Sequence, residues 1–190
     1  MLHLQSQIEI DVPAADTFRL LCDPARKTAL NPAIELLSAA LVSAGPVGQG
    51  SRIHYHLRTG AGVRSFHCTV TAFAPDRLIE MESDTSPPFR VRQTLEATLY
   101  GCSLLHEEWL DDGAVALPAQ THEQPLPILK RLLQEAIGHG LPSTTLLRER
   151  QREALRDQLL QSLALWLGNI KDALEIASQA APAENSALAT

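Results

Sequence analysis

Apolar and polar residues alternate through most of the first 110 positions, and apolar residues follow helical spacing in one long later segment. From Leu2 to Ile10, every second residue is apolar except Ser6, a pattern typical of a half-buried strand. From residue 145 to about residue 178, apolar residues recur at three- and four-residue steps instead. These positions are Leu147, Leu155, Leu159, Leu163, Trp166, Ile170 and Leu174. A helix of this length needs a large apolar partner, and the inner face of a sheet is the obvious one.

Two short helices are predicted after the first strand. Pro13 precedes the first, over residues 14–22, and proline suits a first helical turn because its missing N–H would be unpaired there. The second is predicted over residues 25–30. It ends before Asn31-Pro32, since the residue before a proline disfavours helical geometry.

A strand is expected over residues 36–43, followed by glycines at 45, 48 and 50 that are spaced somewhat like those of a phosphate-binding loop. Such a loop must lead into a helix N-terminus, whose free N–H groups bind the anion. Here the segment leads into the alternating residues 51–58. We therefore predict a hairpin turn between two strands.

The register of the next strands follows from their turns. A two-residue hairpin loop at 60–61 or 61–62 and a turn at Pro75-Asp76 align three strands with one shared apolar face. That face is predicted to carry Ile53, Tyr55, Leu57, Phe66, Cys68, Val70, Ala72, Ile79 and Met81. The opposite face carries Arg52, His54, His56, Arg58, His67, Thr69, Thr71, Glu80 and Glu82.

Two more strands are predicted over residues 91–99 and 102–110, and the parity of the last one is open. A two-residue loop before it would point Leu104, His106, Glu108 and Leu110 inward. A three-residue loop would instead point Leu105, Glu107 and Trp109 inward. The choice decides which ionisable groups reach the interior.

Residues 1–180 are expected to form a single domain, with an extended loop and short amphipathic helix over 113–142 and a flexible tail over 181–190. The apolar residues of the helix predicted over 126–138 occupy more than one face. It is therefore either a lid over a cavity mouth or the contact of a homodimer.

Charge and cysteine content narrow the function classes. The net charge is −6 and no dense run of Lys and Arg exists, which argues against nucleic acid and anionic membrane surfaces as partners. No apolar stretch is long enough to span a membrane. Three widely spaced cysteines argue against a disulfide framework and favour a cytoplasmic protein.

A few polar residues fall on the predicted inner face. Tyr55 and Gln93 are expected to line a cavity, since ligand pockets combine an apolar lining with a few placed polar groups. His106 with Glu108 would be the best acid–base pair if the last strand points them inward, and Glu107 is the candidate for the other parity. Gly168, inside the long helix, predicts a close approach of a strand or ligand, or else local fraying.

No cofactor and no metal are expected. His54, His56 and His67 share the outer face of one hairpin, and Asp84 could lie near His67. Zinc binding would need a fourth ligand and ordered partners for the histidines. We expect this face to be solvated instead.

Several short segments together resemble one protein superfamily. They are residues 10–18, Cys22-Asp23-Pro24, Asn31-Pro32, residues 47–51 and the Trp166 to Lys171 stretch of the last helix. With the order of elements, they are similar to the START-like, birch-pollen-allergen-like (SRPBCC) superfamily of polyketide cyclase/dehydratase and lipid-transport proteins. Members commonly have Trp-Asn-Pro where this chain has Leu30-Asn31-Pro32.

The resemblance implies an α+β helix-grip fold, in which a curved antiparallel sheet of six to seven strands wraps around the C-terminal helix and leaves an apolar cavity. It carries no catalytic motif across. The leading hypothesis is a carrier of a small hydrophobic ligand: a lipid, polyketide, quinone or aromatic molecule. The expected ligand-binding residues are Tyr55, Phe66, Val70, Met81, Gln93, Leu163, Trp166 and Ile170. The alternatives are a cyclase/dehydratase-type enzyme that uses pocket His and Glu, and a non-catalytic interaction or chaperone-accessory protein.

Overall fold

The sheet has seven antiparallel strands in the order β1-β7-β6-β5-β4-β3-β2. The computed structural model describes residues 1–60, 62–111 and 144–180. The strands are β1 (Leu2–Ile10), β2 (Glu35–Leu41), β3 (Arg52–Thr59), β4 (Gly62–Ala74), β5 (Leu78–Ser83), β6 (Arg90–Ala97) and β7 (Cys102–Leu110). The first described strand, β1, pairs with the last, β7. As a result β1 forms one edge of the sheet and β2 forms the other.

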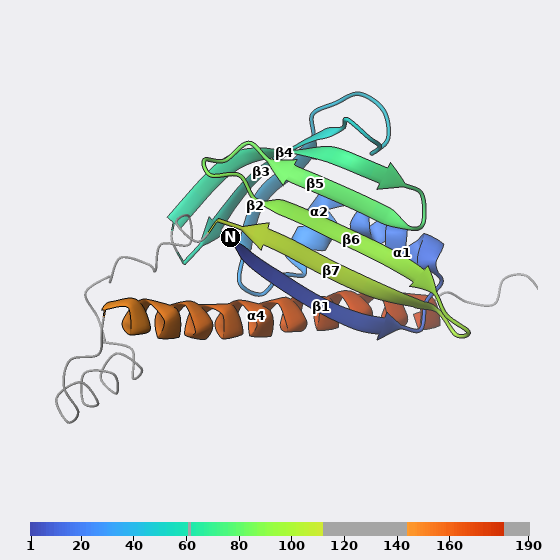
Figure 1. Ribbon diagram of the computed structural model, residues 1–190. Helices are drawn as coiled ribbons and strands as arrows, with labels where there is room; N and C mark the ends of the chain where they lie inside the picture. Colours follow the sequence, from blue (N-terminus) through green and yellow to red (C-terminus); the bar gives the residue numbers. More distant parts are fainter. Residues whose placement is uncertain (61, 112–143, 181–190) are drawn as a thin grey trace, which may run out of the picture.

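The described helices all lie on one side of the curved sheet, as Figure 1 shows. They are α1 (Ala14–Leu21), α2 (Pro24–Ala29) and α4 (Thr144–Ala180). Asp23 caps α2 by accepting a hydrogen bond from the backbone N–H of Arg26, the role expected of an aspartate before a helix. The long helix α4 runs along β1 and packs against it. Within the described residues, no helix combines the length and apolar character that a membrane crossing requires.

Most elements lie where the sequence predicts them, and the helix-grip arrangement is confirmed. The glycine-rich segment at 45–50 leads into β3 and not into a helix, as expected of a turn. The helix predicted over 126–138, the rest of 113–142 and the tail 181–190 fall outside the described residues.

One register prediction is wrong because β4 contains a β-bulge. Val70 pairs with Met81 as predicted, but the next pairs are Ala72 with Glu80 and Phe73 with Ile79. The extra residue reverses which side chains of β4 face inward beyond this point. Phe73, and not Ala72, therefore reaches the interior, where its ring packs edge-on against Phe18 of α1 at a centroid distance of 5.3 Å.

The open parity of β7 is settled in favour of the two-residue loop. Ala97 pairs with Cys102, and the N–H of Thr98 donates to the backbone oxygen of Gly101, so two residues form the loop tip. As a result His106 points inward and is completely buried. Glu107 points outward, where its carboxylate lies 3.3 Å from Nε2 of His3, so it is not an interior acid or base.

The core lies between the sheet and the helices. The buried stripe of α4 consists of Leu163, Trp166, Leu167 and Ile170, while Leu155, Leu159 and Leu174 are half-buried. The side chain of Leu147 lies outside the described residues. Full burial of each aliphatic side chain is worth about 1.5–3 kcal/mol, so this stripe accounts for the packing of α4 on the sheet.

The close approach of a strand predicted at Gly168 is wrong, whereas the close approach of a ligand stays a prediction. A Cβ added there would meet no heavy atom within 4 Å, and neighbouring Leu165 is 63% exposed. The helix also continues unbroken to Ala180, so fraying does not explain the glycine either. Among the glycines that the structure describes, packing requires Gly101, since a Cβ there would collide with the backbone of Ile10 and Val12.

Candidate functional site

Four polar side chains form a hydrogen-bonded chain through the apolar interior. Nζ of Lys27 in α2 lies 3.3 Å from Oε1 of Gln93 in β6. Nε2 of Gln93 lies 3.2 Å from Nδ1 of His106 in β7, and Nε2 of His106 lies 2.9 Å from Oε1 of Glu108. Lys27, Gln93 and His106 are 4%, 1% and 0% exposed, whereas the side chain of Glu108 is 25% exposed. This chain, called here the interior polar chain, thus runs from a deep amine to a carboxylate that water can reach.

The direction of each hydrogen bond follows from the chemistry of the lysine. An amine that is protonated can only donate, so the atom of Gln93 facing Lys27 is its oxygen. The amide nitrogen of Gln93 must then donate to Nδ1 of His106, which leaves the proton of the imidazole on Nε2. That proton is donated to Glu108. The geometry therefore specifies a neutral imidazole in one tautomer and a chain whose donors all point from Lys27 toward Glu108.

Trp166 of α4 covers the interior polar chain. Its ring packs edge-on against the imidazole of His106 at a centroid distance of 5.1 Å. Its Nε1 donates to the backbone oxygen of Lys27 at 3.0 Å. Three residues later, Nδ2 of Asn169 donates to the backbone oxygen of Leu30 at 2.9 Å. Carbonyls at a helix C-terminus lack intrahelical partners, so α4 completes the hydrogen bonding of α2 while it covers the site.

The amine of Lys27 has an unusual electrostatic environment. Burial lowers its pKa from the ordinary 10.5 to about 8, against the opposing influence of Cys22, Cys68 and Asp23. Among the described residues, no carboxylate forms an ion pair with Nζ. The interior therefore holds a cation whose charge is not neutralised by direct contact.

The Tyr55 hydroxyl and the three cysteine thiols keep their protons at neutral pH. Burial raises the pKa of the Tyr55 hydroxyl and raises that of the Cys68 thiol to about 12. Burial likewise raises the pKa of Cys22 and Cys102. A cysteine nucleophile acts as the thiolate, so these values argue against nucleophilic catalysis by the three cysteines.

The predicted ligand-binding residues share the inner side of the molecule. Tyr55, Val70, Met81, Gln93, Leu163, Trp166 and Ile170 are buried there. Phe66 is half-buried and stacks on Tyr55 at a centroid distance of 5.6 Å. Their role in binding stays a prediction.

The sequence does not predict Lys27 as an interior residue, because lysine is rarely buried without a paired charge. The signal that points to it is its place in the six-residue helix α2, which is flanked by the buried Leu21 and the half-buried Cys22 and Leu30.

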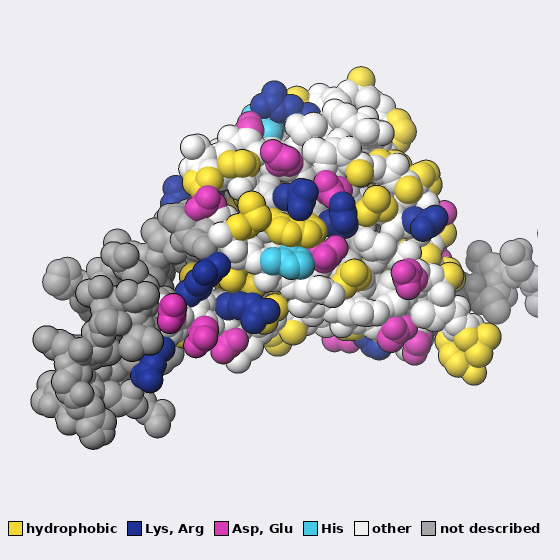
Figure 2. All heavy atoms as spheres, viewed as in Figure 1, with side chains coloured by type: hydrophobic (Ala, Val, Ile, Leu, Met, Phe, Trp, Pro, Cys, Tyr) yellow, Lys and Arg dark blue, Asp and Glu magenta, His cyan; other side chains and the backbone are white. Residues whose placement is uncertain are grey.

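The outer face of the sheet is occupied by contacts among its own side chains. Trp109 lies between His3, stacked at a centroid distance of 4.8 Å, and Arg90, whose Cζ is 4.1 Å from the ring centroid. Figure 2 shows charged side chains of both signs over this face. At the predicted histidine cluster, Nδ1 of His67 lies 3.1 Å from Asp84, and the backbone N–H of His67 holds the pKa of the Asp84 carboxyl below its usual value. The described residues contain no group of three metal-ligating side chains arranged to hold an ion.

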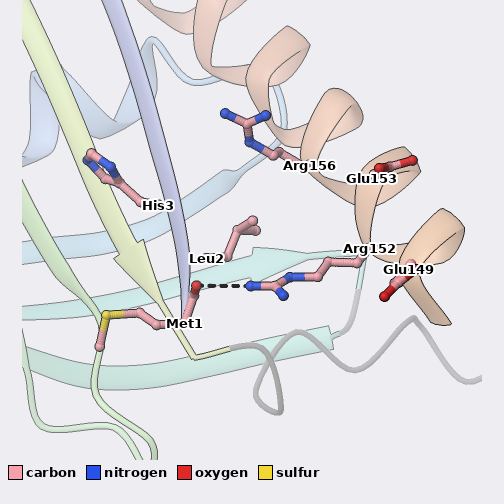
Figure 3. Close-up of a pocket in the computed structure, with 7 residues that line it drawn as sticks. All are labelled: Met1, Leu2, His3, Glu149, Arg152, Glu153 and Arg156. Carbon is pink, nitrogen blue, oxygen red and sulfur yellow. Dashed lines mark hydrogen bonds between the residues drawn. The ribbon is translucent and has the colours of Figure 1, made fainter. Parts of the chain in front are cut away.

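A pocket of about 340 Å³ opens between the start of β1 and the first turns of α4 (Figure 3). Its lining consists of Met1, Leu2, His3, Glu149, Arg152, Glu153 and Arg156. Nη2 of Arg152 donates to the backbone oxygen of Met1 at 3.1 Å. This lining is largely charged and contains none of the predicted ligand-binding residues. It does lie near the exposed end of the interior polar chain, since Leu4, two residues after Leu2, pairs with Glu108.

Comparison with known proteins agrees with the fold. The family model described as polyketide cyclase / dehydrase and lipid transport matches residues 1–99. No curated protein matches the chain. A solved structure from Nitrosomonas europaea has a TM-score of 0.58 at 9% identity and covers 94% of this chain and 97% of its own. An AHSA1-like protein from Aeromonas hydrophila has a TM-score of 0.55 at 14% identity, covering 93% and 94%.

The di-domain ARO/CYC protein StfQ of the steffimycin biosynthetic pathway is also similar, with a TM-score of 0.60 at 14% identity. The match covers 93% of this chain and 51% of StfQ, so the chain spans about half of that protein. At these identities the structural likeness establishes the fold alone. The family match over residues 1–99, about half of the sequence, establishes more: the chain belongs to the polyketide cyclase / dehydrase and lipid transport family.

Proposed function

We propose that the protein binds a small, mainly apolar molecule between the inner face of the sheet and α4. The observation that carries this proposal is the interior polar chain, which places a lysine, an amide and an imidazole inside an otherwise apolar interior. Ligand sites in proteins typically combine an apolar lining with a few polar groups that orient the ligand.

Stability alone does not account for these residues. A buried polar group contributes little net stability even when paired, and a buried charge without a counter-ion is destabilising. An apolar side chain at position 27 would avoid that cost. The presence of the amine is therefore better explained by a molecule that contacts it.

The family description supports the same conclusion. It joins lipid transport to polyketide cyclisation, and both involve small molecules with extensive apolar surface. The binding energy would come chiefly from that surface, at about 25 cal/mol for each Å² removed from water, before ordering costs are subtracted. A carrier function follows if no chemistry takes place at the polar chain.

Acid–base catalysis is a second candidate function, and the His106–Glu108 contact favours it. Glu108 is the member of the interior polar chain that water reaches, and Nε2 of His106 donates to its carboxylate at 2.9 Å. Glu108 would take a proton from the bound molecule, with His106 holding the carboxylate in place. Both imidazole nitrogens already have partners, so His106 would act by positioning Glu108. The test is a Glu108→Gln variant, which would retain binding and lose turnover of a polyketide substrate. Unchanged turnover would contradict this role.

The sequence also predicts a cytoplasmic protein, and a helix over residues 126–137 that is either a lid over the cavity mouth or the contact of a homodimer. The three cysteines are free thiols, which is compatible with a reducing compartment. Gel filtration coupled to light scattering tests the dimer.

Titration with the neutral fluorescent probe N-phenyl-1-naphthylamine tests the binding proposal. We expect saturable binding of one probe molecule per chain, because the proposed site is single and apolar. Native mass spectrometry of the freshly purified protein should also detect a small apolar molecule carried through purification. Absence of saturable probe binding under native conditions would overturn the proposal.

A further inference from the structure

Lys27 offers more hydrogen-bond donors than its surroundings accept. A protonated amine has three N–H donors, and the described residues provide one acceptor for them, Oε1 of Gln93 at the long distance of 3.3 Å. The side chain is nonetheless almost completely removed from water. Donors of a buried cation that lack acceptors are a strong indication of a missing partner.

The other charged and titratable groups around Lys27 do not supply that partner. Asp23 uses its carboxylate to cap α2 at the N–H of Arg26. The thiols of Cys22 and Cys68 keep their protons, since burial raises their pKa. Glu108 is separated from Nζ by both Gln93 and His106, so the interior polar chain orients donors without neutralising the amine.

Resting on the binding function proposed above, we propose that the ligand carries an anionic oxygen group, for which a carboxylate is the simplest form, and that Nζ of Lys27 binds that group at the inner face of the sheet. The apolar body of the ligand then lies among the buried residues of the sheet and α4. An anion satisfies the remaining N–H donors and neutralises the charge, which a neutral molecule of the same shape does not.

Binding of an anion also predicts proton uptake. The free protein has a Lys27 pKa of about 8, and a bound carboxylate favours the protonated amine. Above pH 8 the ligand therefore has to bind together with a proton. Its affinity is expected to fall by up to about tenfold per pH unit above that value, by reciprocal linkage between the two events. Cys22 and Cys68 face the same amine, and ionisation of either thiol at higher pH would weaken anion binding further.

The experiment compares decanoate with 1-decanol as competitors of bound N-phenyl-1-naphthylamine at pH 7. We expect decanoate to bind about tenfold to a hundredfold more tightly, the range for hydrogen bonds to a charged group. A Lys27→Met variant should lose the preference for decanoate over decanol. The matched control is Arg26→Met, which removes a positive charge from the exposed side of the same helix and should keep the preference.

The outcomes separate this inference from the binding function itself. If the probe binds but decanoate has no advantage over decanol, or keeps its advantage in Lys27→Met, the inference is wrong and the binding function stands. If the probe does not bind at all, both fall. Should Lys27→Met not fold, calorimetry of the wild-type protein at pH 9 in two buffers of different ionisation enthalpy decides the matter. Proton uptake with decanoate but not with decanol supports the inference, and equal uptake contradicts it.

Discussion

Nε1 of Trp166 donates a hydrogen bond to the backbone oxygen of Lys27 at 3.0 Å, which ties the long helix α4 to the short helix that carries the buried amine. The same indole packs edge-on against His106. One side chain of α4 thus contacts both ends of the Lys27–Gln93–His106 arrangement. Loss of this contact should affect stability and ligand binding together.

A Trp166→Phe variant tests that relationship. It keeps an aromatic ring but leaves the oxygen of Lys27 without its donor, so we expect a loss of about 1–3 kcal/mol in the free energy of unfolding. The measurement is urea denaturation followed by circular dichroism. Trp109→Phe is the matched control on the outer face and should lose less than about 1 kcal/mol, since a phenyl ring still stacks under Arg90. Equal losses in the two variants would contradict the account.

The buried amine predicts a specific dependence of stability on pH. Between pH 8 and 10.5 the unfolded chain binds a proton at Lys27 that the folded chain does not, so the free energy of unfolding rises with pH through this window. The thiol of Cys68 acts in the opposite direction above pH 9, because its pKa in the folded protein is raised from 9.0 to about 12. Comparing wild type with Lys27→Met cancels the thiol contribution. From pH 8 to 9 the wild type should gain about 1 kcal/mol relative to the variant, and parallel profiles would show that the Lys27 pKa is not lowered.

The tautomer of His106 is a direct readout of the interior polar chain. The geometry requires a proton on Nε2 and none on Nδ1. Nitrogen-15 NMR of the imidazole should show this tautomer at neutral pH. A proton on Nδ1 would instead require Gln93 to turn its oxygen toward His106 and its amide nitrogen toward Lys27, which would leave the amine without an acceptor.

Gly168 and Gly101 should respond to substitution by alanine in opposite ways. Gly168→Ala should raise the free energy of unfolding by about 0.5–1 kcal/mol, because alanine favours the helix and its Cβ meets open space. Gly101→Ala should lower it by about 1–3 kcal/mol, because its Cβ collides with the backbone of β1. Chemical denaturation of both variants provides the comparison. A destabilised Gly168→Ala would restore the idea of a close approach at α4.

The sequence predicted those parts of the fold that depend on local periodicity. Alternation along β1 and helical spacing along α4 reflect which side of each element faces the core, and the structure confirms both. The bulge in β4 could not be predicted from the sequence pattern. The extra residue moves Phe73 into the inward position that unbroken alternation would give to Ala72. Both are apolar, so the pattern looks the same in either register.

The site was predicted in part. His106 and Glu108 are predicted to point inward for one of the two parities of β7. The two-residue loop between Thr98 and Gly101 selects that parity. Lys27 could not be predicted from its residue type, since its burial depends on α4, which lies more than one hundred residues away in the sequence. Gln93 becomes informative only once Lys27 and His106 are known to lie on either side of it.

The most direct test of ligand binding between the sheet and α4 uses the two tryptophans as position markers. The sequence contains only Trp109, on the outer face, and Trp166, in the interior. With both variants saturated with N-phenyl-1-naphthylamine, the bound probe should accept excitation energy from the nearer indole, so energy transfer should persist in Trp109→Phe and fall strongly in Trp166→Phe. The opposite result, with transfer lost in Trp109→Phe and kept in Trp166→Phe, would place the ligand on the outer face and contradict the account.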